Sequence, residues 1–370
     1  MNSDSIEKPN KDQHALLVSC AIKGDFTTWN EYVSNLDETI KLRGANLSNL
    51  NISDAIFKSK NGRGADLYKA NFKNSILSGI DFSDVNLMEA EFQGADISGG
   101  FFHDTVCVRA QFESTKFTMV DFTCANLQEA TFKFTRFFEC NFYETNFVAA
   151  NLEGARFIGG GYNPFLGSEH RLNLCGASFI KAKFDNETFF DLFNVSIRTD
   201  FRATNFESAN FSSGLRQTLQ YCNRRHNWND WYRQRSDVKS FFVKAFWLHS
   251  DYGNSTARIV KAFFSICFLF ALIYCVFPNM IIGLEPWQPI RSLYFSIVTM
   301  TTLGFGDMFA RPDSWAAQCI IMIQVLYGYV LLGALISVLS NLFISDGPAQ
   351  GLIIHPRKPL KISFKIQDIP

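Results

Sequence analysis

The most regular pattern in this 370-residue sequence is a bulky residue at every fifth position, from Leu67 to Tyr162. A small or β-branched residue stands two positions before each one, beginning with Ala65 and Ala70. Because helices repeat every 3.6 residues and strands every 2, a period of five predicts a repeat architecture. We expect a solenoid that turns a corner every five residues. Its predicted interior residues are Leu67, Phe72, Leu77, Phe82, Leu87, Phe92, Ile97, Phe102, Cys107, Phe112, Phe117, Phe122, Leu127, Phe132, Phe137, Phe142, Phe147, Leu152, Phe157 and Tyr162.

Three breaks interrupt this period. Residues 58–64 insert a short loop, and residues 158–171, which include three consecutive glycines, insert a longer one. A last shift is expected near Asn194. Before the repeats, residues 1–44 have the spacing of a small helical cap in two pieces, separated at Gly24. The interior residues expected after the long insertion are Leu174, Phe179, Phe184, Phe189, Phe201, Phe206 and Phe211.

Four segments carry a recognisable consensus, and they are Ala45-Asn46-Leu47, Ala65-Asp66-Leu67, Ala125-Asn126-Leu127 and Ala150-Asn151-Leu152. They resemble the pentapeptide-repeat family, in which four A-(D/N)-L-x-x repeats make one coil of a right-handed quadrilateral β-helix. The resemblance implies such a β-helix over residues 45–213. Some members of the family mimic DNA, but residues 45–212 carry 15 Lys/Arg against 20 Asp/Glu without an acidic stripe. We therefore expect a scaffold and no nucleic-acid partner.

Two apolar stretches follow the repeats. Residues 259–277 contain one charge, Lys261, and residues 316–344 contain none. Each stretch is long enough to cross a bilayer. Residues 216–261 hold nine basic and three acidic residues, whereas residues 278–315 hold two basic and three acidic ones. This asymmetry predicts a cell-membrane protein with two spans and both termini in the cytoplasm.

A helix-length apolar segment, residues 290–300, lies between the two spans and leads into Thr301-Thr302-Leu303-Gly304-Phe305-Gly306-Asp307. The two glycines give this loop a backbone freedom that residues with a Cβ lack. The loop offers a row of backbone carbonyls, a threonine hydroxyl and the negative end of a helix dipole. Irregular backbone at membrane depth must be buried in protein or line a watery cavity. Four such loops around one axis can replace the hydration shell of a potassium ion.

The loop also resembles the potassium-channel signature Thr-x-x-Thr-x-Gly-(Tyr or Phe)-Gly-Asp, which here begins at Thr299. This resemblance implies an all-α, two-transmembrane pore domain over residues 257–344 that assembles as a homotetramer. Phe305 is expected to pack on Tyr294 and Phe295. The implied selectivity filter for K⁺ consists of Thr302, Leu303, Gly304, Phe305 and Gly306, supported by Thr299, Thr301 and Asp307.

Glycines in the second apolar stretch leave two interpretations open. By resemblance to two-span potassium channels, Gly328 lies near the position of an inner-helix hinge. Close helix packing is the competing interpretation for Gly328 and for Gly333. We expect Ser337, Ser340 and Asn341 to line the inner mouth of a pore.

The two remaining segments are a linker and a tail. Residues 214–256 interleave aromatic and basic residues in a helical pattern. This composition suits a membrane surface with anionic lipids, and an ordinary helix between domains is the alternative. Residues 345–370 form the tail, in which apolar and polar residues alternate after Pro359. That alternation predicts a short strand that adds to an open end of the solenoid.

Charge and cysteine spacing limit which metal sites, disulfides and enzyme classes the sequence could support. The net charge is zero, and the nine cysteines are scattered without a C-x-x-C pair. This spacing argues against a zinc site and against a disulfide framework. The sequence contains no motif for a catalytic nucleophile, a metal site or a phosphate site, so we do not expect an enzyme. We expect no cofactor, only K⁺ as the permeant ion.

The two resemblances occur together in bacterial pentapeptide-repeat ion channels. They imply a tetrameric potassium-selective channel whose cytoplasmic repeat domain has a scaffold or regulatory role. One alternative is a weakly selective cation channel, because Phe305 lacks the hydroxyl of the commoner tyrosine. The other is a membrane-anchored repeat module that binds an unidentified cytosolic protein.

Overall fold

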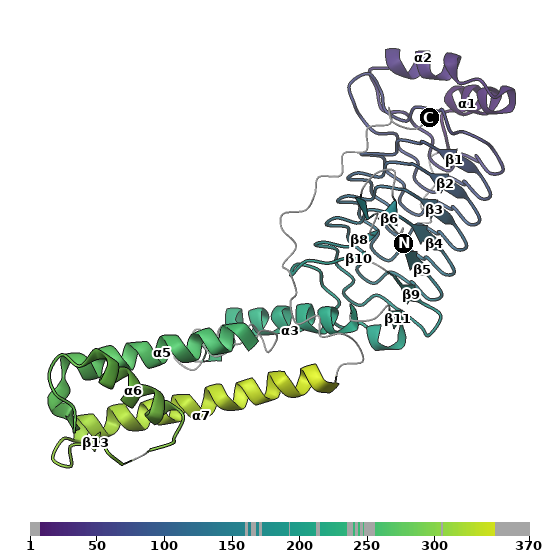
Figure 1. The fold of residues 1–370 in the computed structure, drawn as a ribbon. Coiled ribbons are helices and arrows are strands. Elements are labelled where there is room, and N and C mark those ends of the chain that lie inside the picture. Colours follow the sequence, from purple (N-terminus) through teal and green to yellow (C-terminus); the bar gives the residue numbers. More distant parts are fainter. Residues whose placement is uncertain are drawn as a thin grey trace. The chain divides into compact units, whose positions relative to one another are not determined.

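The computed structural model describes residues 8–159, 162–163, 168–169, 172–191, 193–211, 215–234, 240, 243–244, 247, 256–304 and 306–344. The chain divides into two compact units, with the boundary between Asn227 and Trp228. The first unit holds the repeats, and the second holds the two apolar stretches (Figure 1). The predicted strand of the tail lies outside the described residues.

The first unit is a parallel β-solenoid preceded by two helices, α1 (Lys11–Lys23) and α2 (Thr27–Asn35). Short strands stack along one face in the order β1, β2, β3, β4, β5, β9, β11 (Figure 1). They are β1 (Ile76–Ser78), β2 (Asp96–Ser98), β3 (Lys116–Thr118), β4 (Arg136–Phe138), β5 (Arg156–Ile158), β9 (Phe189–Phe190) and β11 (Asn210–Phe211). The other elements are β6 (Tyr162–Asn163), β7 (Ser168–Glu169), β8 (Leu172–Asn173), β10 (Phe193–Asn194), η1 (Phe206–Ser208) and α3 (Leu215–Gln234), which continues past Asn227.

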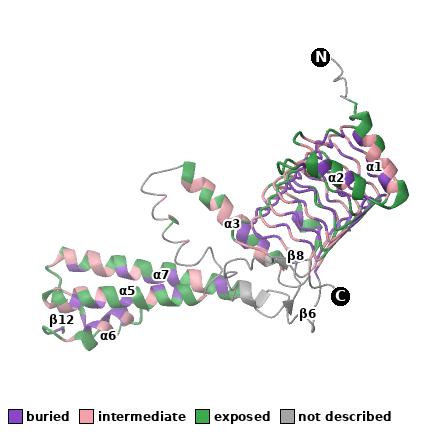
Figure 2. Cartoon of the chain, turned by 90° about the horizontal axis from the view of Figure 1, so that it is seen from above, coloured by how far each residue is buried: buried purple, intermediate pink, exposed green. Residues whose placement is uncertain are grey.

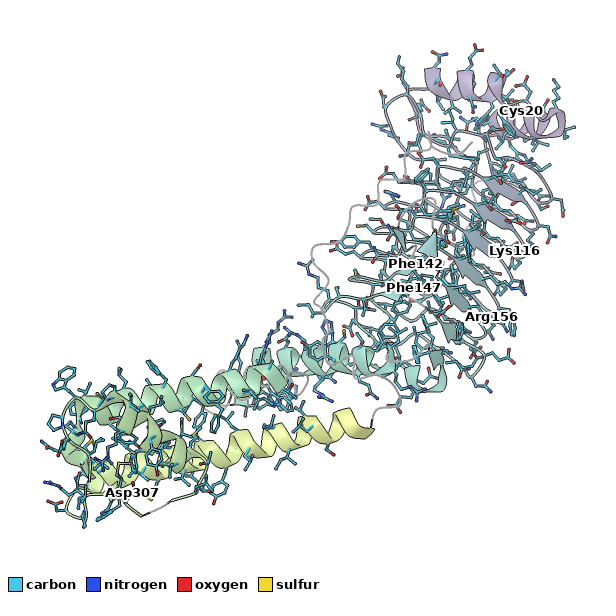
Figure 3. All side chains as sticks on the ribbon, viewed as in Figure 1. Cys20, Lys116, Phe142, Phe147, Arg156 and Asp307 are labelled. Atoms are coloured by element: carbon cyan, nitrogen blue, oxygen red, sulfur yellow. The ribbon has the colours of Figure 1, made fainter. Side chains whose placement is uncertain are left out.

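The register of the strands confirms the predicted architecture. Ile97 pairs with Phe117, and Phe117 pairs with Phe137, so one coil contains 20 residues and four repeats. The predicted interior residues from Leu67 to Phe157 are all buried (Figure 2). Along the strand face, exposed Lys116 and Arg156 flank buried phenylalanines and mark the outer surface (Figure 3).

Phenylalanine rings of successive coils stack in columns inside the solenoid. Phe112 lies parallel to Phe92 and Phe132, with 4.9 Å between ring centroids in both pairs. Neighbouring columns meet edge to face, as Phe112 and Phe117 do at 5.5 Å. Offset-stacked and edge-to-face pairs are the arrangements that aromatic quadrupoles favour. The columns explain why 39 of the 370 residues are phenylalanine.

Two cysteines occupy interior positions in place of larger residues, as predicted. Cys107 and Cys140 are fully buried and free. Burial raises the pKa of both thiols, that of Cys140 to about 12, because an apolar interior disfavours the thiolate. All nine cysteines are free in the structure.

The register after the long insertion differs from the prediction at one position. Leu174, Phe179 and Phe184 are buried as expected, but Phe190, not Phe189, pairs with Phe157. The reason lies in residues 185–188, where the Asp185 carboxylate accepts hydrogen bonds from backbone N–H groups of Gly154, Glu187 and Thr188. This wider turn uses one extra residue, and the core position moves by one. Tyr162 lies in β6, and its side chain is outside the described residues.

From Lys69 to Gly154, each five-residue corner places one residue at positive φ. Asn74, Glu89, Arg109, Ser114 and Glu129 all lie between +55° and +59°. At the corners outside strands β1 to β4, the amide of the residue after the corner donates to the carbonyl of the preceding interior residue, as Ser75 does to Phe72 at 3.1 Å. These corners are β-turns whose third residue is left-handed, a conformation that costs residues with a Cβ free energy.

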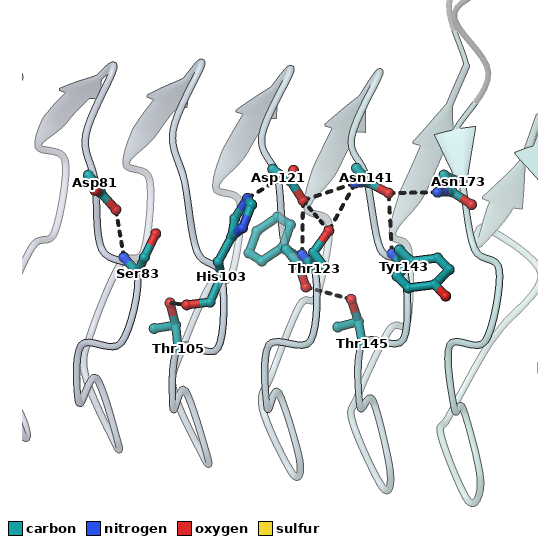
Figure 4. A network of polar contacts seen from close by, with 11 residues as sticks. Asp81, Ser83, His103, Thr105, Asp121, Thr123, Asn141, Tyr143, Thr145 and Asn173 are labelled. Carbon is teal, nitrogen blue, oxygen red and sulfur yellow. Dashed lines mark hydrogen bonds and ion pairs between the residues drawn. The ribbon is translucent and has the colours of Figure 1, made fainter. Parts of the chain in front are cut away.

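Asparagine and aspartate before the interior residue have two roles (Figure 4). The Asn141 side chain accepts from the backbone N–H of Tyr143, which closes the corner. It also donates to Asp121 in the preceding coil at 3.0 Å, while Asn173 donates to it at 2.8 Å. Phe101 interrupts this ladder, and His103 contacts Asp121 instead, at 2.9 Å. The D/N preference therefore comes from bonds within and between coils.

Carboxamide side chains cover both ends of the solenoid. At the first end, Asn30 of α2 donates to the carbonyl of Asp54 and accepts from the N–H of Ile56. At the last end, Asn223 of α3 accepts from the N–H of Phe201 and donates to its carbonyl. Each amide thus replaces the backbone of a missing coil. Such covering removes the open edges that other chains would pair with.

Removing one ring from a column should be costly. We expect Phe112→Ala to lower the free energy of unfolding by about 3–5 kcal/mol, because Phe92 and Phe132 lose their stacking partner. Phe112→Leu should cost less than half as much, since leucine serves as an interior residue at other corners. Urea unfolding of the detergent-purified protein measures both variants. Equal costs would contradict a stabilising role for ring stacking.

The corners should tolerate side chains according to their fit to positive φ. Ser114 is exposed and has φ of +59°. A β-branched residue is strongly strained there, so Ser114→Val should destabilise the protein by about 1–2 kcal/mol. Ser114→Asn is the matched control and should leave stability unchanged. Thermal unfolding of the two variants checks this, and equal stability would contradict the geometry of the corners.

Candidate functional site

The second unit places the predicted loop between two long helices. Its elements are α5 (Thr256–Val276), η2 (Pro278–Met280), β12 (Ile281–Ile282), α6 (Pro289–Met300), β13 (Phe309–Ala310) and α7 (Trp315–Ile344). α5 and residues 315–340 of α7 are each long and apolar enough to cross a membrane. The 12-residue α6 packs against both of them. One buried cluster joins the three helices through Ile259, Ala262, Cys267, Met300, Leu331 and Val338.

Much of the apolar surface of these helices is exposed in the single chain (Figure 2). Phe268 and Leu272 of α5 and Leu326 and Val330 of α7 are each at least half exposed. Soluble monomers rarely expose contiguous apolar surface of this kind. The second unit therefore has surface for lipid or for other copies of the chain.

The loop begins at a left-handed turn that ends α6. The N–H of Leu303 donates to the carbonyl of Val298 at 3.1 Å, and the N–H of Thr302 donates to Thr299 at 3.2 Å. This pair of bonds is a Schellman motif, in which glycine is the usual left-handed residue. Here that residue is Thr302, with φ of +59°. A β-branched residue at positive φ is strained, and such strain persists where the surroundings impose it.

Positive φ recurs at every second residue along the loop. Thr302, Gly304 and Gly306 have φ values of +59°, +32° and +79°. In an extended strand, successive carbonyls point to opposite sides. Alternating φ signs instead turn successive peptide groups the same way. The loop therefore has the backbone needed to present a row of carbonyls on one side, and both glycines supply φ values that other residues adopt with strain.

Three carbonyl groups of this loop have no hydrogen-bond donor among the described residues. Among the described residues, no donor reaches the carbonyl oxygens of Thr302, Leu303 or Gly304. Leu303 and its neighbours are exposed in the single chain. Backbone carbonyls are almost always paired in proteins, with protein, water or another ligand. Phe305, whose carbonyl is the fourth predicted ion ligand, lies outside the described residues, and so does its predicted packing.

The threonine side chains differ in their surroundings. Thr299 is buried against the end of α6, whereas Thr301 and Thr302 are exposed. The Thr301 hydroxyl donates to the carbonyl of Ile297 at 2.9 Å, and the Thr302 hydroxyl donates to Thr301 at 2.7 Å. The lone pairs of the Thr302 hydroxyl remain available to a cation.

A small antiparallel sheet holds the outer end of the loop. Ile281 and Ile282 of β12 pair with Ala310 and Phe309 of β13, which follows Asp307 closely in the chain. A Cβ at Gly283 would lie 2.8 Å from the carbonyl oxygen of Asp307, so only glycine permits this approach. The loop is therefore tied at both ends, by α6 and by β13.

A cavity of about 360 Å³ lies beside the loop. Residues of α6, the loop and α7 surround it, including Tyr294, Phe295, Thr302, Gly304 and Tyr329. Tyr294 and Phe295 were predicted to contact Phe305. Both border the same space as the loop residues on either side of Phe305.

A buried polar network, which the sequence pattern did not predict, joins the three helices. Gln324 of α7 contacts Tyr274 of α5 and Ser296 of α6, and Ser296 contacts Cys267 of α5. All four residues are almost fully buried. The available signal was a glutamine in the middle of an apolar span, since polar residues within membrane spans are rare and often functional.

Gly328 lies where α7 approaches the end of α6 most closely. A Cβ at Gly328 would overlap the carbonyl oxygen of Met300, whereas a Cβ at Gly333 would have no atom within 4 Å. Of the two interpretations of Gly328, this geometry supports close packing. Ser337 and Ser340 of α7 are exposed in the single chain, and the side chain of Asn341 lies outside the described residues.

The described part of the chain contains no group of three or more His, Cys, Asp or Glu side chains placed to hold a metal ion. The oxygens that the loop itself offers are the backbone carbonyls of Thr302, Leu303 and Gly304 and the hydroxyl of Thr302. Such oxygens suit weakly hydrated monovalent cations arranged in a row of sites.

The two α7 glycines provide a test of close packing. We expect Gly328→Ala to destabilise the protein by about 1–3 kcal/mol, because the added methyl group overlaps the Met300 carbonyl. Gly333→Ala should leave stability unchanged or raise it, since alanine is the better helix former. Thermal unfolding in detergent compares the two. Equal stability would contradict the packing role and favour the hinge.

Comparisons with known proteins agree with this division of the chain. Residues 259–345 match the ion channel family, and residues 61–104, 105–142 and 125–159 match the pentapeptide-repeat family. A 79-residue stretch, 21% of this chain, is 33% identical to TWiK family of potassium channels protein 7 from Caenorhabditis elegans. The match spans 14% of that relative's length.

Similar solved structures are pentapeptide-repeat proteins. HetL, a protein involved in heterocyst differentiation regulation in Nostoc sp. strain PCC 7120, is 18% identical, with a TM-score of 0.35 over 53% of this chain and 75% of HetL. QnrB1, a plasmid-mediated fluoroquinolone resistance protein, is 17% identical, with a TM-score of 0.28 over 48% of this chain and 79% of QnrB1. From its two matched regions and its own geometry, the chain is a pentapeptide-repeat β-solenoid joined to an ion-channel domain with two membrane spans.

Proposed function

We propose that four copies of this chain assemble around a fourfold axis and conduct potassium ions. The observation that carries the proposal is the row of carbonyls at Thr302, Leu303 and Gly304, to which no described residue donates a hydrogen bond. In a membrane, unpaired backbone groups cost several kcal/mol each, so they require water, a partner or an ion. A single exposed loop cannot surround an ion, whereas four loops facing one axis can.

The chemistry of the loop supports a dehydrated cation as its ligand. Carbonyl oxygens replace the water shell of K⁺ when several rings of them are stacked. Thr302 adds a hydroxyl oxygen, and the C-terminal end of α6 adds negative potential at the inner side. Under this proposal Gly306 and Asp307 complete the outer mouth, and Phe305 contributes a fourth carbonyl.

The same surfaces that the single chain exposes suit assembly and membrane insertion. Leu303 and the exposed apolar residues of α7 face neighbouring copies or lipid under this proposal. The sequence asymmetry of basic residues favours a cytoplasmic solenoid with both termini on that side. In this arrangement the solenoid is a scaffold or regulatory surface for the channel.

The residues before the first span suit a membrane surface. Trp228 packs on Trp231, Tyr232 and Trp247, with ring centroids 5.2–5.9 Å apart, and Lys244 lies 5.7 Å from the Tyr232 ring. Aromatic rings are favoured at headgroup depth, and basic side chains are attracted to anionic lipids. Lipids are thus a proposed partner of this segment.

Substitution of the central filter glycine tests the proposal. We expect Gly304→Ala to abolish discrimination of K⁺ over Na⁺, because alanine is strained at a φ of +32° and the loop must change shape. Reversal potentials of the protein in lipid bilayers under K⁺/Na⁺ gradients measure this. Gly333→Ala is the matched control and should discriminate as the wild type does. Wild-type discrimination in Gly304→Ala would refute the assignment of the filter.

A further inference from the structure

Gln324 lies at the centre of the only described contact in which all three helices of the channel domain share hydrogen bonds. Its Oε1 accepts from the Tyr274 hydroxyl at 2.5 Å. Its Nε2 donates to the Ser296 carbonyl at 2.9 Å and to the Ser296 hydroxyl at 2.8 Å. The Ser296 hydroxyl then donates to the carbonyl of Cys267 at 2.7 Å.

Every donor atom in this network has an acceptor. The tyrosine hydroxyl, the Gln324 Nε2 and the serine hydroxyl all donate hydrogen bonds. Gln324 and Ser296 have no exposed surface, and Tyr274 is 1% exposed. Because water does not reach the site, moving one helix would leave buried polar groups without partners. Such a loss costs more than the net contribution of the bond itself.

The network lies one helical turn before the end of α6, which leads into the filter. Ser296 stands four residues before Met300, the last residue of α6. On α7, Gln324 likewise stands four residues before Gly328, which touches the Met300 carbonyl. Two contacts, one polar and one steric, therefore fix the rotation and the height of α6 against α7. Thr301 and Thr302 follow directly on the fixed turn.

We propose that Gln324 is a positioning residue that couples the place of α7 to the shape of the filter. The inference rests on the proposed function. With the network intact, α6 holds the Thr302 turn in its strained left-handed form, and the carbonyl row keeps its spacing. When α7 rotates or tilts, the network breaks, α6 is released and the filter leaves its conducting form. Movement of the inner helix would in this way change conduction at the filter.

Gln324→Met tests the coupling, because methionine has a similar length and keeps the apolar packing. We expect it to raise the rate at which current is lost after external K⁺ is replaced by Na⁺ by about tenfold, the effect of losing one buried hydrogen bond. Ser296→Ala should act in the same direction. The double variant should resemble either single one, because both remove the same contact. Ile323→Met, on the exposed side of α7, is the matched control.

The outcomes separate this inference from the function on which it rests. If Gln324→Met loses thermal stability but keeps the wild-type permeability ratio and rate of current loss, the network only holds the helices together and the inference is wrong. Strictly additive effects of Gln324→Met and Ser296→Ala would also overturn it. If wild-type protein in bilayers carries no current under any ion gradient, the proposed function fails and the inference fails with it.

Discussion

Each backbone N–H and C=O group needs a hydrogen-bond partner, and this requirement explains the structure of both units. In the solenoid, every coil satisfies the next one, and the side chains of Asn30 and Asn223 complete the two ends. In the channel domain, helices satisfy themselves, and the loop from Thr302 to Gly304 stands apart with carbonyls that the described chain leaves unpaired. The solenoid pairs its backbone polar groups within the chain. The channel domain exposes carbonyl groups that an ion would coordinate.

Strain is distributed differently in the two units. Between Lys69 and Gly154 the solenoid places one left-handed residue at each corner, and the stacked rings behind the corners supply the packing that offsets this strain. In the channel domain, Trp287 and the β-branched Thr302 are the described non-glycine residues at positive φ, and the Schellman bonds of α6 hold Thr302. Gly328 and Gln324 fix α6 from the side of α7. The filter therefore depends on helix packing that lies outside the filter itself.

Much of this structure could be predicted from the sequence because its causes are local. The five-residue period gave the interior of the solenoid, since each bulky residue occupies the same place in its repeat. The prediction failed at Phe189, because the hydrogen bonds of Asp185 widen one turn and no hydrophobic pattern reveals an Asx-type turn of that length. The loop from Thr302 to Asp307 was predicted as a unit for a related reason: its glycines lie where the backbone has positive φ.

The hydrophobic pattern of the sequence does not predict contacts between residues that lie far apart in the chain. Gln324 is an isolated polar residue in the sequence, and its role emerges only when Tyr274 and Ser296 are brought to it from two other helices. The choice between hinge and packing at Gly328 likewise depends on the carbonyl of Met300, 28 residues earlier in the chain. The role of Gln324 and the packing of Gly328 both depend on which residues are close in three dimensions, and the spacing of residues along the sequence does not show this.

The central claim is that one chain supplies an incomplete ion site that four copies complete. Native mass spectrometry of the protein in detergent, with K⁺ present, tests this most directly. The account predicts a complex of four chains, each of 42.0 kDa, that retains bound potassium ions. A folded monomer or dimer that holds no potassium would contradict it.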